Sequence, residues 1–133
     1  MALKDTFCSS PWMHIKISHN GQFTFCRWDI DKEPEFDLET NIRSIDPLRF
    51  FKENMKPFRQ GLLNGIPQEK CVECYQVDKH NKISGRQRQL LKSGISLDQF
   101  EKTTLSSPML QYFKRLDGST DLDPIDWQID LGN

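Results

Sequence analysis

The stretch FCSSPWMHIKISHNGQFTFC (residues 7–26) decides the fold of this chain. Apolar and polar residues alternate along 13–18, the chain turns at 19–21, and the alternation resumes over 23–25. The turn contains Asn-Gly, the strongest short signal for a hairpin, because both residues tolerate the positive φ of a type I′ turn. The pattern therefore predicts a two-stranded antiparallel hairpin.

Helical patterns fill much of the remaining chain. Asp46 followed by Pro47 is typical of a helix start, and Pro57 interrupts a single long helix because proline lacks the N–H that the helix needs. Asp117-Gly118 ends a later amphipathic stretch. Helices are expected over 47–54, 57–63, 75–91 and 108–116.

The last segment of the sequence alternates again. Residues 127–131, WQIDL, predict a strand, and the hairpin is the one evident partner for it. The expected fold class is therefore α+β: a small metal-stapled domain with an N-terminal β-hairpin, several short helices and a C-terminal strand.

Composition narrows the function classes. The chain has 133 residues, about one domain, and only 36% of them are hydrophobic, so a metal or a partner would help a thin core. Eighteen Lys and Arg against nineteen Asp and Glu give a net charge of -1, which does not favour nucleic acid as a partner. Because the sequence lacks a long apolar run and a signal-like start, no membrane partner and a cytoplasmic location are expected.

Four cysteines carry the chemistry: Cys8, Cys26, Cys71 and Cys74. The last two form a C-x2-C, and the four together supply enough thiolates for one tetrahedral metal centre. A reducing cytoplasm argues against disulfides. The same four ligands suit either zinc or a 4Fe-4S cluster, and ligand count does not separate the two.

Other residue types give weaker signals. His14, His19 and His80 are ligands in principle but are not required beside four cysteines. Lys70 and Arg27 neighbour cysteines, where a cation can stabilise thiolates. We find no catalytic constellation of carboxylates or serines, and the C-x2-C lacks the βαβ context of a thiol redox enzyme.

The order of these motifs resembles a known family. Phe7-Cys8-Ser9-Ser10-Pro11-Trp12, then Asn20-Gly21 and Cys26, then 59–65, the C-x2-C and Ser84-Gly85-Arg86 together resemble radical S-adenosylmethionine (SAM) proteins with a twitch domain, a shortened SPASM domain. The resemblance covers most of residues 7–92. It implies that Cys8, Cys26, Cys71 and Cys74 ligate an auxiliary 4Fe-4S cluster, that Gly21 permits the turn, and that Trp12 packs over the site.

The sequence also departs from that family. Its members continue into a C-x3-C-x2-C motif that holds the cluster which cleaves SAM, and these 133 residues contain no such motif. Cleavage is therefore not expected of this chain alone. WQIDLGN (127–133) resembles the first strand of the family's barrel. The resemblance therefore divides the chain into a twitch-like domain (1–116) and an acidic linker with the start of a barrel strand (117–133). Both a piece of a longer enzyme and a stand-alone module without the barrel fit this division, and the cost of exposing an unpaired terminal strand favours the piece.

Two functional hypotheses follow. The first is an auxiliary 4Fe-4S module that serves electron transfer or substrate positioning, with a radical SAM barrel in cis or in a partner protein and with SAM bound only in the longer parent. The alternative is a structural zinc module with four Cys ligands that mediates protein interactions.

Overall fold

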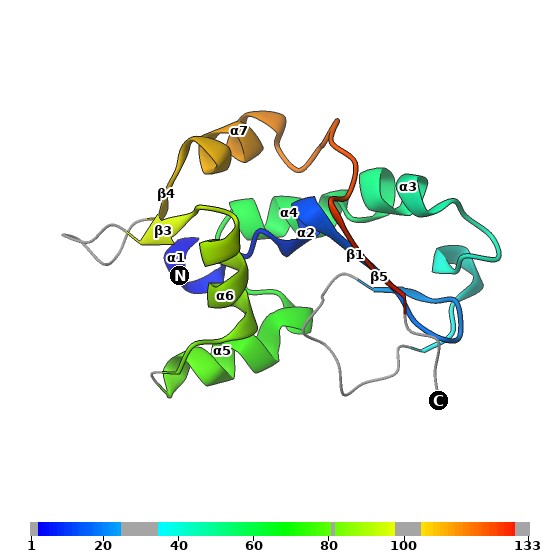
Figure 1. Ribbon diagram of the computed structural model, residues 1–133, viewed down its shortest axis with the longest axis horizontal. Helices are drawn as coiled ribbons and strands as arrows, with labels where there is room; N and C mark the ends of the chain where they lie inside the picture. The colour runs from blue at the N-terminus through cyan, green and yellow to red at the C-terminus, as the bar shows by residue number, and fades with distance from the viewer. Residues whose placement is uncertain (1–2, 25–34, 81, 98–104, 130–133) are drawn as a thin grey trace.

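A computed structural model describes residues 3–24, 35–80, 82–97 and 105–129 of the chain (Figure 1). The label η denotes a 3-10 or π-helical turn. The elements in chain order are α1 (Leu3–Thr6), α2 (Ser10–Met13), β1 (His14–Ile17), β2 (Phe23–Thr24), η1 (Leu38–Thr40), α3 (Pro47–Arg49), η2 (Phe50–Asn54), α4 (Lys56–Leu63), η3 (Glu69–Cys71), α5 (Val72–Lys79), α6 (Gly85–Lys92), β3 (Ser96–Leu97), β4 (Leu105–Ser106), α7 (Pro108–Leu116) and β5 (Asp126–Ile129). Within these ranges no helix is long and apolar enough to cross a membrane. The expected mixed α+β class is confirmed.

The predicted hairpin is present, with shorter strands than its sequence pattern predicts. β1 pairs antiparallel with β2, Lys16 opposite Thr24 and Ile17 opposite Phe23, while Trp12 and Met13 belong to helix α2. The type I′ prediction is wrong, because Gly21 has a φ of 83° but Asn20 does not adopt a positive φ. The Gly21 N–H donates to Ser18 O (2.9 Å), a turn in which only the glycine enters the left-handed region.

The C-terminal strand does pair with the hairpin. β5 runs parallel to β1, in the register His14 to Asp126 and Ile17 to Ile129, and the strand order is β2-β1-β5. The two strands lie side by side towards the end of the molecule that carries α3 (Figure 1). β1 is therefore central, and all four of its residues are buried.

Local signals place the helix around Pro47 and the break before Pro57 correctly. The Asp46 carboxylate caps α3 by accepting from the N–H groups of Leu48 and Arg49. The chain then widens into the π-helical turn η2 and restarts as α4 at Lys56, with proline in the first turn, where its missing N–H is tolerated.

The single helix expected over 75–91 is wrong, because the structure contains two helices there. α5 begins at Val72 and ends at Lys79, and α6 begins at Gly85 after its N-cap, Ser84, whose hydroxyl accepts from Gln87 N–H (3.2 Å). The Ser84 side chain caps a new helix, and this capping is favoured over one continuous helix because the helical pattern between 75 and 91 is weak. The C-x2-C consequently lies at the start of a helix rather than in a loop.

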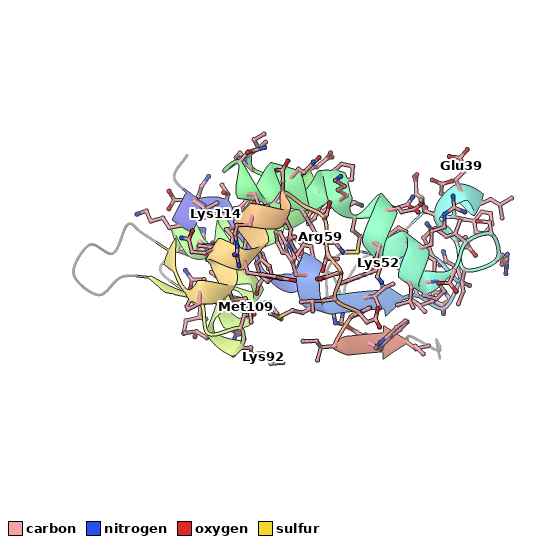
Figure 2. The ribbon with its side chains drawn as sticks, turned by 90° about the horizontal axis from the view of Figure 1, so that it is seen from above. Glu39, Lys52, Arg59, Lys92, Met109 and Lys114 are labelled. Atoms are coloured by element: carbon pink, nitrogen blue, oxygen red, sulfur yellow. The ribbon has the colours of Figure 1, made fainter. Side chains whose placement is uncertain are left out.

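Two apolar clusters form the core of the described residues, one among the helices and one beneath the sheet. The first consists of Phe7, Trp12, Leu62, Leu90, Ile95, Leu110 and Phe113. The second consists of Ile15, Ile17, Phe23, Phe50, Phe51 and Met55. Arg59 lies in the interior in Figure 2, whereas Lys92 and Glu39 lie at the periphery.

Two glycines with positive φ offer a matched stability test. A Cβ on Gly94 (φ 71°) would meet no atom within 4 Å, whereas a Cβ on Gly118 (φ 87°) would lie 2.5 Å from Gln60 Cγ and 3.0 Å from Lys56 O. We expect Gly94→Ala to lower the free energy of unfolding by about 1 kcal/mol through backbone strain alone. Gly118→Ala should cost about 2 to 3 kcal/mol, because steric overlap adds to the strain.

Urea denaturation of the two variants measures this difference. Equal losses for Gly94→Ala and Gly118→Ala would show that α7 does not end closely against α4.

Candidate metal centre

Three of the four predicted ligands fall within the described residues. Cys8 lies between α1 and α2, Cys71 ends η3 and forms the N-cap of α5, and Cys74 lies in the first turn of α5. Cys8 and Cys71 are buried, Cys74 is half-buried, and none of the three forms a disulfide. Cys26 lies outside the described residues.

The three cysteines do not form an assembled ion site by themselves. In the described ranges, no three Cys, His, Asp or Glu side chains form a group that could hold a metal ion. Two side chains, Tyr75 and Arg86, instead make hydrogen bonds that link the Cys8 segment to the segment of Cys71 and Cys74.

Tyr75 makes the first of these ties. Its hydroxyl donates to Thr6 O (3.0 Å), two residues before Cys8, and accepts from Gln68 N–H (3.2 Å). The same hydroxyl is hydrogen-bonded to the Cys71 thiol, and burial raises the pKa of Tyr75 above its usual value. A neutral tyrosine thus links the chain before Cys8 to the first cysteine of the C-x2-C.

Arg86 makes the second tie. One of its terminal nitrogens, Nη1, donates to Lys4 O (2.8 Å) and to Phe7 O (2.9 Å), the carbonyl directly before Cys8. Its Nε and Nη2 bind the Asp78 carboxylate at 3.0 and 2.9 Å. Arg86 therefore fixes the start of α6 against both α5 and the Cys8 segment.

Backbone donors surround the sulfurs. Ser10 N–H donates to Cys8 Sγ (3.5 Å), and the N–H groups of Gly85 and Arg86 donate to the Cys74 sulfur. Such donors favour the thiolate form over the thiol. They orient the sulfurs of Cys8 and Cys74 before any metal binds.

The balance of effects on Cys74 matters for its reactivity. Burial raises the pKa of the Cys74 thiol and the Asp78 carboxylate adds to the rise, whereas the Arg86 N–H and guanidinium and the Gly85 N–H oppose it. The net pKa is raised, so without a metal Cys74 stays largely a thiol at neutral pH. A thiol redox enzyme needs the opposite, a lowered cysteine pKa, so this environment argues against that function.

The other residues singled out from sequence have the following places. Gly21 closes the hairpin turn, as expected. Trp12 is 1% exposed and stacks on Phe113 at 4.6 Å between ring centroids, and its ring also contacts Phe7, the residue before Cys8, at 5.3 Å. Of the histidines, His14 is buried in β1, while His19 and His80 are exposed. Lys70 is exposed, and Arg27 lies outside the described residues.

Sequence reasoning missed the residues that surround the cysteines. Tyr75 and Asp78 lie four and seven positions after Cys71, so helical spacing places them on the side of α5 that carries Cys71, and Asp78 also lies one turn after Cys74. That signal was available, but only if the C-x2-C is placed at a helix start. No comparable local signal identifies Arg86 as their partner.

The donor chemistry fits a thiolate-bound iron-sulfur cluster. Such clusters are held by cysteine thiolates and are tuned by hydrogen bonds to sulfur and by nearby charge. Cys8 and Cys74 have N–H donors, and a guanidinium lies beside Cys74. Comparisons with protein-family models, with curated proteins and with solved structures found no match to this chain.

Proposed function

We propose that this chain is an auxiliary 4Fe-4S module, with Cys8, Cys26, Cys71 and Cys74 as the ligands. The observation that supports it best is the double tie, through Tyr75 and Arg86, between the Cys8 segment and the C-x2-C 63 residues later. Cysteines so distant in sequence share neighbours here, and each neighbour also bonds a carbonyl close to Cys8. One cluster bound by both segments explains why a thin core maintains this arrangement.

The residues around the proposed site have distinct roles. Ser10, Gly85 and Arg86 present N–H groups to sulfur, which orients the ligands and offsets negative charge. Tyr75 donates its hydroxyl proton to Thr6 O (3.0 Å) and lies beside Cys71, so it holds the chain before Cys8 against the first cysteine of the C-x2-C. The cluster, when bound, would supply one-electron transfer or an anchoring point for a substrate.

The proposal includes a radical SAM barrel, in cis or in a partner protein, as the place where SAM binds. β5 supports this part, because it is an edge strand of the described sheet with Trp127 45% and Ile129 61% exposed. A parallel edge strand with exposed apolar side chains is suited to extension by a further strand or to cover by another domain.

Anaerobic reconstitution tests the proposed function. The purified chain should take up about four iron and four sulfide per molecule with broad visible absorption, because each iron takes one thiolate. Metal analysis and spectroscopy of protein isolated anaerobically give the readout. Folded, monomeric protein that takes up no iron would contradict the proposal.

A structural zinc module is the alternative, since the same N–H donors also suit zinc thiolates. In that case one zinc should bind per chain without visible absorption, and a chelator should unfold the protein. Zinc found after aerobic purification would not distinguish the two, because zinc can occupy a site that serves a cluster in the cell.

A further inference from the structure

Near Cys74 lies a largely buried ion pair between Arg86 and Asp78. The Arg86 and Asp78 side chains are only 5% and 16% exposed, and they meet at 2.9 Å. The second carboxylate oxygen, Asp78 Oδ1, is buried and accepts no hydrogen bond from the described residues. Because burial of two charges removes their hydration, such pairs often contribute little net stability.

The pair is fixed in place from several directions. Asp78 follows Cys74 by one turn of α5, and Arg86 is held at the start of α6 by the carbonyls of Lys4 and Phe7. Asp78 lies on the same face of α5 as Cys74, and Arg86 binds Asp78 at 2.9 Å, so a negative and a positive charge lie close to this cysteine. Cys74 thus lies beside one fixed cation and one fixed anion.

We propose that Arg86 and Asp78 are positioning residues that set the reduction potential of the cluster, with opposite effects. This inference rests on the proposed function. Reduction adds one electron to an already anionic centre. A nearby cation stabilises the reduced form and raises the potential, and a nearby anion lowers it.

Two single variants test the sign. Arg86→Gln should lower the equilibrium constant for reduction about tenfold, which is about 59 mV for one electron, and Asp78→Asn should raise it by a similar factor. The readout is a redox titration of the reconstituted chain followed by electron paramagnetic resonance. A purely structural pair predicts otherwise, because each change breaks the same ion pair and would lower the thermal midpoint without opposite shifts in potential.

Three further variants make the test specific. Arg86→Lys keeps the positive charge, so the equilibrium constant for reduction should stay within about twofold of the wild-type value. The double variant Asp78→Asn/Arg86→Gln removes both charges and should return close to wild type. Arg88→Gln removes an exposed cation from the same helix and should leave the potential unchanged, because solvent screens it.

The outcomes separate this inference from the proposed function. If wild-type protein binds no cluster, the proposed function fails, and the inference fails with it. If wild type binds the cluster but the two single variants shift the potential in the same direction, or not at all, only the inference is overturned. Loss of cluster loading in both Arg86→Lys and the double variant also overturns the inference. The ion pair would then be needed to hold the folded site together rather than to set its potential.

Discussion

Replacement of Arg59 by methionine is expected to lower the free energy of unfolding by about 4 kcal/mol or more. Arg59 is fully buried and donates to three backbone carbonyls: Nε to Pro11 O (2.7 Å), Nη1 to Gly118 O (3.3 Å) and Nη2 to Phe51 O. Methionine fills a similar volume but leaves all three acceptors without a donor, at about 1 to 3 kcal/mol each.

The Arg59 guanidinium stays charged in this environment. Burial lowers the pKa of Arg59 to about 10, which is still well above neutral pH. The group lies over the Phe51 ring, 4.6 Å from its centroid, so the ring face adds to the stabilisation from the carbonyl dipoles. One side chain therefore joins α2, η2 and Gly118, two residues after α7, and its loss should weaken the packing of both apolar clusters.

Urea denaturation followed by circular dichroism measures the Arg59 effect. The control is Arg49→Met, because Arg49 and its partner Glu53 are each 65% exposed, and loss of that pair should change the unfolding free energy by about 0.5 kcal/mol or less. A loss below about 1 kcal/mol for Arg59→Met would mean that the three carbonyls find other donors.

The parts of the fold with strong local signals could be predicted from sequence. Gly21 marks the hairpin turn, Asp46 and Pro47 mark the start of α3, and Asp117-Gly118 ends α7 in the left-handed region. Each of these signals acts within four or five residues through φ preferences or capping hydrogen bonds. Such effects do not depend on the rest of the fold.

The features that depend on distant contacts could not be predicted. β3 and β4 form a small antiparallel sheet that no sequence pattern indicated. η2 bulges next to Arg59, whose carbonyl partners come from segments up to 59 residues away. The same holds for the candidate metal centre, where the ligand set was proposed from cysteine spacing but Tyr75, Asp78 and Arg86 emerged only from contacts across the fold.

Loss of one cysteine should have the largest effect on metal content. Cys74→Ala is expected to reduce iron after anaerobic reconstitution to clearly below about four per chain, because one iron loses its thiolate and the cluster is held less firmly. Cys8→Ala, Cys71→Ala and Cys26→Ala should behave alike, since one closed centre uses all four. Iron and sulfide analysis of each variant gives the measurement.

Ser10→Ala is the matched control for the cysteine variants. Ser10 is 1% exposed, and its hydroxyl has no hydrogen-bond partner among the described residues. The backbone N–H that donates to Cys8 Sγ remains in the variant, so cluster loading should equal that of wild type. If Cys26→Ala alone retains iron, the fourth ligand is another side chain. If all four cysteine variants lose iron and Ser10→Ala retains it, Cys26 belongs to the same centre as the C-x2-C.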